Sequence, residues 1–141
     1  MDRKATAQWK GDLMTGTGTI STASKVLSST QYSFKTRFQD GIGTNPEELL
    51  AAAHAGCFSM ALSAMLATEN LKADSIDTTC TISLEKDGEG FTVTKSHLAL
   101  EAKVPGATEE SFTRLTNMAK EGCPVSKLFN TKITLDATLE A

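Results

Sequence analysis

The feature of this chain that most constrains its fold is residues 49–67, where almost every side chain is apolar or small. The residues just before this segment are typical of a helix N-terminus, because Asn45 can cap a helix and Pro46 suits its first position. Glu47 and Glu48 follow in the first turn, where the helix dipole favours negative charge. A helix that is apolar on nearly every face must be buried on all sides. The sequence therefore predicts a long central helix that one chain of 141 residues cannot cover by itself.

A membrane-spanning helix is the alternative explanation of this segment. The segment contains His54, Ser59 and Ser63, many weakly hydrophobic alanines, and acidic instead of basic flanks. All of these features argue against a span. We therefore predict no membrane association. Because burial of the helix on all sides takes a second copy of the chain, we predict a homodimer with an extensive, partly intertwined interface.

The rest of the chain predicts a single α+β domain, residues 1–141, with the element order βββαββααβ. Three alternating segments precede the central helix, and the third of them, at 32–38, places Arg37 on its polar side. The elements expected after the central helix are a strand at 76–84, a partner strand at 91–104 with a bulge at 95–97 that contains His97, a helix capped by Thr108 and ended by Gly122, a short helix at 123–129, and a strand at 133–139. This order favours mostly antiparallel sheets packed on the central helix.

Composition excludes several classes of protein. The net charge of −3 and scattered Lys and Arg argue against a nucleic-acid partner, which would need a clustered basic surface. The N-terminal segment lacks the apolar stretch of a secretory signal, so we predict a cytoplasmic protein. Three cysteines without a CxxC pair fit neither a disulfide-stapled domain nor a standard zinc site. We expect no metal and no bound cofactor, and cysteine chemistry that is catalytic or absent.

The three cysteines have different local settings. Cys57 lies in the middle of the central helix among small side chains, where a plain core residue is the ordinary explanation. Cys123 lies at a predicted helix N-terminus, where unsatisfied N–H groups and the helix dipole stabilise a thiolate. Local reasoning therefore favours it over Cys57 as the nucleophile, and a plain N-cap residue in place of Ser or Asp is an equally weighted alternative. Cys80 shares the apolar face of its strand and is predicted to be inert.

Three polar residues near these cysteines are open to two interpretations. His54 lies three residues before Cys57, which permits a thiolate–imidazole pair, although a packed or hydrogen-bonded histidine is the preferred interpretation. Arg37 and Glu47 also have plain structural explanations, as a surface arginine and a first-turn acid. Residue patterns alone do not decide between these roles.

Two segments together resemble a known family. The segment TRFQDGIGTNPEELLAAAHAGCFSMALSAML and the later EGCPVSKLF closely resemble the OsmC/Ohr family of osmotically inducible and organic hydroperoxide resistance proteins. The resemblance covers the whole chain and is stronger to the OsmC branch, given the sequence motif AAHAGCFSMAL and the arginine in TRF.

The resemblance implies a thiol-dependent peroxidase that protects against oxidative stress by reducing organic hydroperoxides to alcohols. In such an enzyme Cys57 is the peroxidatic cysteine, Cys123 is the resolving cysteine, and Arg37 with Glu47 is the polar pair that activates Cys57. The implied cycle passes through a Cys57 sulfenic acid and a Cys57–Cys123 disulfide, which an external dithiol such as a lipoylated protein would reduce. This assignment makes Cys57 the nucleophile, whereas the local sequence around each cysteine favours Cys123.

Helix geometry adds a constraint on this site. Glu47 and Cys57 are ten residues apart in the sequence, which is about 15 Å along a helix axis. Either the helix is broken between them, or Arg37 and Glu47 come from the neighbouring subunit, and we favour the second explanation. Two other functions remain as alternatives: a cysteine hydrolase that uses Cys57 and His54, and a non-enzymatic dimeric binding module for apolar ligands.

Overall fold

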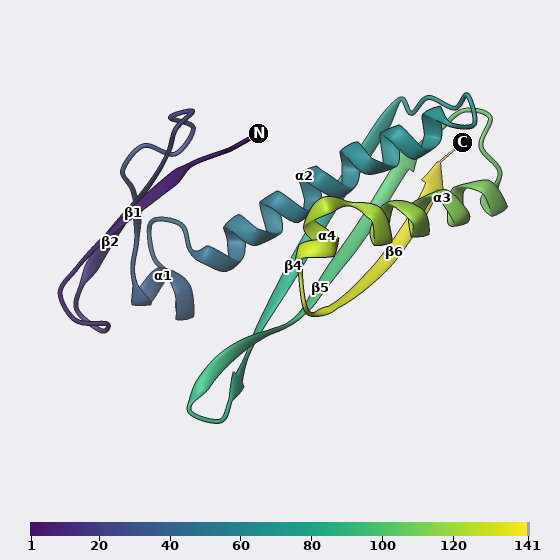
Figure 1. The fold of residues 1–141 in the computed structure, drawn as a ribbon. Coiled ribbons are helices and arrows are strands. Elements are labelled where there is room, and N and C mark those ends of the chain that lie inside the picture. The colour runs from purple at the N-terminus through teal and green to yellow at the C-terminus, as the bar shows by residue number, and fades with distance from the viewer. Residues whose placement is uncertain (141) are drawn as a thin grey trace. The chain divides into compact units, whose positions relative to one another are not determined.

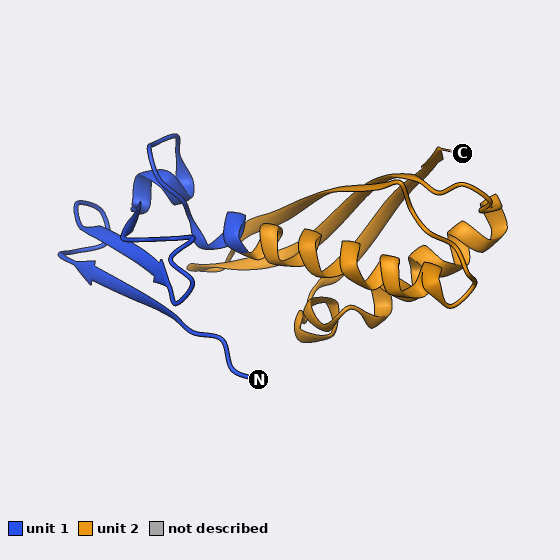
Figure 2. Cartoon of the chain, turned by 90° about the horizontal axis from the view of Figure 1, so that it is seen from above, with its two compact units in different colours: residues 1–49 blue, residues 50–141 orange. Residues whose placement is uncertain are grey.

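The computed structural model describes residues 1–140, which form an α+β protein with two three-stranded sheets (Figure 1). Contacts along the chain divide it into two compact units, Met1–Leu49 and Leu50–Ala141 (Figure 2). Each unit contains one of the two sheets.

The first unit contains an antiparallel sheet of three short strands, β1 (Ala5–Lys10), β2 (Thr17–Thr22) and β3 (Thr30–Tyr32), in that order. The rings of Trp9 and Tyr32 lie on either side of Gly18 in the middle strand, and their centroids are 5.4 Å apart. A side chain at Gly18 would collide with both rings, so the glycine permits this aromatic pair.

The third strand is shorter than the sequence predicts, and this prediction is wrong for residues 34–38. A short helix, α1 (Phe34–Phe38), replaces the second half of the strand, so Arg37 lies on a helix. Ser33 and Thr36 form a reciprocal capping box, which favours helix over strand. The spacing that looks alternating also puts Phe34 and Phe38 one turn apart, with ring centroids 4.8 Å from each other.

The central helix α2 (Pro46–Ala67) begins where the sequence predicts. Asn45 Oδ1 accepts a hydrogen bond from the Glu48 backbone N–H at 2.8 Å, and Asn45 Nδ2 donates to the Thr36 carbonyl at 3.0 Å. The residue therefore caps α2 and ties it to α1. The helix is continuous to Ala67, so a break between Glu47 and Cys57 is not found.

Only one stripe of α2 is buried within a single chain. The buried side chains recur every four residues, at His54, Phe58, Leu62 and Leu66. The other faces carry small or apolar residues that stay exposed: Ala52, Ala53, Gly56, Met60, Ala64 and Ala67. Length and composition alone would allow α2 to cross a membrane, but core helices of other proteins meet the same criteria. The expected burial on all sides is thus not achieved by one chain.

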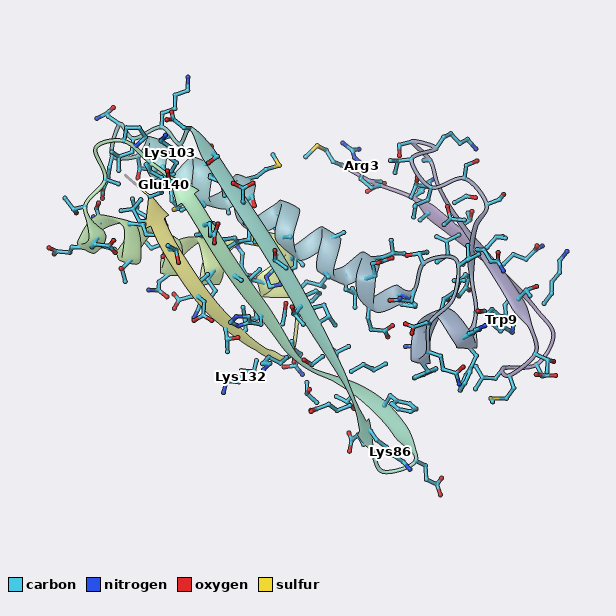
Figure 3. The ribbon with its side chains drawn as sticks, turned by 180° about the vertical axis from the view of Figure 1, so that it is seen from behind. Arg3, Trp9, Lys86, Lys103, Lys132 and Glu140 are labelled. Carbon is cyan, nitrogen blue, oxygen red and sulfur yellow. The ribbon has the colours of Figure 1, made fainter. Side chains whose placement is uncertain are left out.

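The second unit packs helices on one face of a sheet formed by β4 (Ser75–Asp87), β5 (Gly90–Lys103) and β6 (Lys132–Glu140). The pair β4–β5 is antiparallel and β5–β6 is parallel. The helices α2, α3 (Glu109–Gly122) and α4 (Pro124–Leu128) lie on the same side of this sheet (Figures 1 and 2). Figure 3 shows the open face from behind, with Lys103 beside Glu140 at one end. The core lies between the helices and the sheet and includes Phe58, Leu62, Leu98, Leu100, Phe112 and Leu115.

The bulge in β5 lies just before its predicted position. The register changes between Ser83, opposite Lys95, and Leu84, opposite Val93, which leaves Thr94 as the extra residue. His97 pairs regularly with Thr81, so it is not part of the bulge. The predicted Thr108 cap and the end of α3 at Gly122 are confirmed.

The double role of Asn45 gives a prediction about stability. Replacement Asn45→Ala removes both the cap of α2 and the bond to Thr36, and it should lower the free energy of unfolding by roughly 1–2 kcal/mol. Asn45→Asp keeps an oxygen acceptor for the Glu48 N–H and should recover most of this loss. Urea unfolding of the three proteins measures the difference; equal midpoints for the alanine variant and the parent would contradict the capping role.

Candidate active site

Two of the three cysteines meet in the second unit. Cys57 lies in α2, and Cys123 lies at the junction of α3 and α4, as the C-cap of one helix and the N-cap of the other. Their Sγ atoms are 2.9 Å apart, within hydrogen-bond distance for sulfur, and both thiols are free. Because a disulfide bond is about 2.05 Å long, oxidation to a Cys57–Cys123 disulfide needs only a small movement.

The surroundings of the two sulfurs favour charge on Cys123. Burial raises the pKa of Cys123, but contact with the Cys57 thiol and the nearby N–H groups and hydroxyl at the start of α4 together bring the pKa below its ordinary value. Burial raises the pKa of Cys57, and contact with Cys123 raises it further. The start of α4 therefore stabilises the Cys123 thiolate, as the local sequence argument predicts.

Cys57 has no cationic neighbour within the described part of one chain. Among residues 1–140, no Arg, Lys or His side chain contributes to the shift of the Cys57 pKa. For Cys57 to form a thiolate as readily as Cys123, a positive charge from outside these residues would have to lower the Cys57 pKa.

His54 is fully buried and does not pair with Cys57. Its Nδ1 lies 2.6 Å from Ser96 Oγ on β5, and its Nε2 lies 2.7 Å from Ser126 Oγ on α4. Both ring nitrogens are thus occupied by hydroxyl groups, and Phe129 packs edge-on against the ring. Burial lowers the pKa of His54, which keeps the imidazole neutral. The preferred interpretation, a packed and hydrogen-bonded histidine, is confirmed.

Cys80 lies on the inward face of β4, as predicted. Its Sγ is 3.2 Å from Ser96 Oγ and 3.8 Å from His54 Nδ1. Burial raises the pKa of Cys80, and the hydrogen bond with Ser96 opposes this rise only in part. Cys80 is therefore a thiol at neutral pH and sits at the end of the polar cluster around His54.

The predicted pair of Arg37 and Glu47 is formed in the first unit. Arg37 donates to Glu47 through Nε and Nη2, with the shortest bond at 2.7 Å to Oε1. The guanidinium also lies over the Phe38 ring, 5.4 Å from its centroid. This forked pairing fixes the orientation of the arginine while 39% of its side chain stays accessible to solvent.

A cavity of about 280 Å³ adjoins this ion pair within the first unit. Four of its eight lining residues are aromatic, and the Arg37 guanidinium supplies its charge. The lining residues are Trp9, Leu13, Tyr32, Ser33, Phe34, Arg37, Phe38 and Pro46. Such a cavity can hold an apolar group next to a fixed cation.

Two serines of the candidate site are not predicted from the sequence. Ser126 is at the third position of α4, from which a side chain can reach back to the N-cap, so its spacing from Cys123 was an available signal. Ser96 is a polar residue on the inward face of β5, where apolar neighbours dominate. A lone polar residue in such a row indicates a buried hydrogen bond. Among residues 1–140, no group of three or more His, Cys, Asp or Glu is arranged to hold a metal.

These observations define an α+β protein whose central helix holds one thiol against a second thiol at a helix N-terminus. The family model described as OsmC-like protein matches residues 39–138, a range that includes the boundary between the two units. The chain belongs to this family.

Comparison with individual proteins agrees with the family assignment. The chain is 49% identical to peroxiredoxin OsmC of Escherichia coli, over 99% of this chain and 97% of that protein. It is 37% identical to the organic hydroperoxide resistance protein OhrA of Bacillus subtilis, over 69% of this chain and 66% of that protein. Among solved structures, the organic hydroperoxide resistance protein OhrB of Bacillus subtilis has a TM-score of 0.68 at 27% identity, covering 97% of this chain and 98% of that chain.

The buried neutral His54 predicts a pH dependence of stability. Its pKa is lowered in the folded protein from the ordinary value of 6.5, so the unfolded chain binds the proton first as pH falls. Stability should decrease as pH drops through about 6.5 and level off below the folded-state pKa. His54→Gln should remove this part of the loss, because glutamine can bond to a serine but does not titrate.

The measurement is thermal unfolding at several pH values between about 7.5 and 5. His97→Gln is the matched control, since it removes the other histidine of the chain and keeps His54. A parent protein and a His54→Gln variant with parallel profiles would refute the contribution of His54.

Proposed function

We propose that this protein is a cysteine-based peroxidase that reduces organic hydroperoxides to alcohols. The observation that carries the proposal is the 2.9 Å contact between the Cys57 and Cys123 sulfurs, in a chain that is 49% identical to a peroxiredoxin. A peroxidatic and a resolving cysteine have to meet once per cycle, and here they meet before any oxidation.

The proposed cycle has three steps. The Cys57 thiolate attacks one oxygen of the hydroperoxide, the O–O bond breaks, and the alkoxide leaves and takes up a proton to become an alcohol. Cys123 then attacks the sulfur of the Cys57 sulfenic acid, the S–O bond breaks, and the hydroxide leaves as water. An external dithiol, such as a lipoyl group, reduces the Cys57–Cys123 disulfide and regenerates both thiols.

The peroxidatic role of Cys57 requires a cation that its own surroundings lack, because burial and Cys123 both raise the Cys57 pKa. Arg37 fits this need, since Glu47 fixes its guanidinium while part of the side chain remains accessible. Glu47 and Cys57 are ten residues apart in the unbroken helix α2, which corresponds to about 15 Å along the axis. We therefore propose that the partner's Arg37–Glu47 pair serves Cys57 in a homodimer.

The composition of α2 supports the homodimer. Its exposed side carries Ala53, Gly56, Met60 and Ala64, and a Cβ placed at Gly56 would meet no atom within 4 Å beyond the adjacent residues and the helix's own backbone. Small residues of this kind let a second helix approach closely. That helix would cover the exposed face of α2 and so complete the burial that an apolar helix needs. In this assembly, residues 1–141 function as one domain in the cytoplasm.

Two apolar cavities support a substrate with a hydrocarbon part. One is the aromatic cavity beside Arg37, and the other, of about 310 Å³, is lined in the second unit by residues that include Leu50, Val93 and Phe129. Apolar walls favour an alkyl or lipid hydroperoxide over hydrogen peroxide. Phe58 is fully buried in the core and is not available to contact a substrate.

The cycle predicts a specific product of oxidation. One equivalent of cumene hydroperoxide should convert the reduced protein to a Cys57–Cys123 disulfide, located by mass spectrometry of peptides. In Cys123→Ser the same treatment should leave a sulfenic acid on Cys57, whereas Cys57→Ser should not consume peroxide. Cys80→Ser is the control and should behave as the parent. Free thiols at Cys57 and Cys123 after treatment would defeat the peroxidase proposal.

Mixed dimers test where the arginine comes from. Arg37→Met and Cys57→Ser should each abolish turnover, while a mixture of the two chains should recover up to about one quarter of the parent activity. Random pairing makes half of the dimers mixed, and each mixed dimer holds one site with both Cys57 and the partner's Arg37. Lys35→Met, on the same helix α1 as Arg37, is the matched control. If mixing recovers nothing after verified subunit exchange, Arg37 acts within its own chain.

A further inference from the structure

The two sulfurs of the cysteine pair differ in their access from solvent. Cys57 is partly buried and packs at the margin of the hydrophobic core. Cys123 is 0% exposed and belongs to that core, together with Leu115 and Ala119 of α3. A reagent from solvent can therefore touch Cys57 at the surface of the second unit, whereas contact with Cys123 requires the core to open.

The backbone holds Cys123 in its buried position. The Cys123 N–H donates to the Ala119 carbonyl at 3.0 Å at the end of α3, and the Cys123 carbonyl accepts from the Lys127 N–H at 3.1 Å at the start of α4. Pro124 follows at the start of α4, where its ring fixes φ. Movement of the Cys123 sulfur toward solvent would break hydrogen bonds at two helix ends, so this sulfur stays in the core.

Cys57 also stays reachable in the proposed dimer. The hydroperoxide has to meet the Cys57 sulfur in the first step of the cycle, so the working assembly keeps a path from solvent to this atom. The second step requires no such path to Cys123, because its reaction partner is Cys57, with the two sulfurs 2.9 Å apart in the reduced protein. The access of the two sulfurs thus differs in the assembly as it does in one chain.

We propose that the external dithiol attacks the Cys57 sulfur of the Cys57–Cys123 disulfide and that Cys123 is the leaving group. The inference rests on the proposed function, whose last step it specifies. A thiolate of the reductant forms a new S–S bond with Cys57 while the Cys57–Cys123 bond breaks, and the electron pair of that bond stays on Cys123. The second thiol of the reductant then loses its proton and attacks the reductant sulfur of this mixed disulfide. Cys57 leaves with the electron pair and takes up a proton, and the reductant leaves as a disulfide.

The surroundings of Cys123 also favour its departure. Thiol–disulfide exchange is faster when the leaving thiol has the lower pKa. In the reduced protein, burial raises the pKa of Cys123, but contact with Cys57 and the groups at the start of α4 bring this pKa below its ordinary value. Burial and Cys123 raise the pKa of Cys57. Access and leaving-group stability therefore select the same sulfur for attack.

The closeness of the two cysteines defines the kind of reductant. After the first exchange, the Cys123 thiolate is still close to the mixed disulfide on Cys57, because the two sulfurs lie 2.9 Å apart in the reduced protein. Cys123 can attack Cys57 again, re-form the protein disulfide and expel the reductant. A monothiol loses to this return reaction, whereas a second thiol in the same reductant molecule competes with it as an intramolecular group. The site therefore requires a dithiol.

The first test locates the point of attack without any peroxide. Diamide oxidises the reduced parent protein to the Cys57–Cys123 disulfide, and an excess of β-mercaptoethanol, a small neutral monothiol, then starts the exchange. Acid stops the reaction at timed intervals, N-ethylmaleimide alkylates the free thiols, and mass spectrometry of peptides locates both labels. Molecules with the adduct on Cys57 and maleimide on Cys123 should outnumber the reverse pattern roughly tenfold when the ratio is extrapolated to zero time.

The second test measures the return of Cys123 to the mixed disulfide. Rapid gel filtration removes free β-mercaptoethanol, after which the Cys57 adduct of the parent should decay to the protein disulfide. In Cys123→Ser, loaded with the disulfide of β-mercaptoethanol, the same adduct should persist at least about tenfold longer, because no neighbouring thiol can expel the monothiol. Equal lifetimes in the two proteins would contradict the requirement for a dithiol.

Cys80→Ser is the control, and it should give the same ratio of the two adducts as the parent, because Cys80 takes no part in the exchange. An adduct found mainly on Cys123 at early times would overturn the inference, and so would the absence of a Cys57–Cys123 disulfide after diamide. If diamide forms this disulfide and cumene hydroperoxide does not, the proposed peroxidase function fails, while the position of the adduct still decides which sulfur a thiol attacks.

Discussion

The contact between α2 and the junction of α3 with α4 is the constraint on which the second unit depends. The buried stripe of α2 carries His54, Phe58 and Leu62 into the core, and Cys57 lies beside this stripe. Gly122 ends α3 and Cys123 begins α4, so two helix ends meet where α2 passes. The same packing that excludes water from the core therefore brings two thiols within 2.9 Å of each other.

The sequence predicts the elements that depend on strong local signals. The start of α2 follows from Asn45 and Pro46, and the cap of α3 follows from Thr108, because each signal is a side chain that bonds to its own helix end. The prediction of the third strand is wrong beyond Tyr32, because the spacing of Phe34 and Phe38 fits a helical turn as well as a strand. The Ser33–Thr36 capping box favours the helix. The bulge is predicted from a change of phase, which locates it only to within a few residues of Thr94.

Individual residues of the candidate site differ in how far the sequence could predict them. The pairing of Cys57 with Cys123 and of Arg37 with Glu47 came from the family resemblance, and the structure forms both contacts. Their catalytic roles stay predictions. Local reasoning about the helix N-terminus correctly gave the lowered pKa of Cys123, because that effect depends on neighbouring backbone groups. The partners of His54 were beyond local reasoning, since Ser96 and Ser126 lie 42 and 72 residues away in the sequence.

The pKa shifts within one chain and the proposed order of reaction of the two cysteines favour different thiols as the first nucleophile. Within the described residues of one chain, Cys123 is the better stabilised thiolate and Cys57 the poorer one. Under the proposed function, a second copy of the chain places its Arg37 cation beside Cys57, so the reaction of Cys57 with peroxide depends on dimer formation. The thiolate population of Cys123 does not depend on the second copy. The two thiols are then activated by different means, a cation for Cys57 and the nearby hydroxyl and N–H groups at the start of α4 for Cys123.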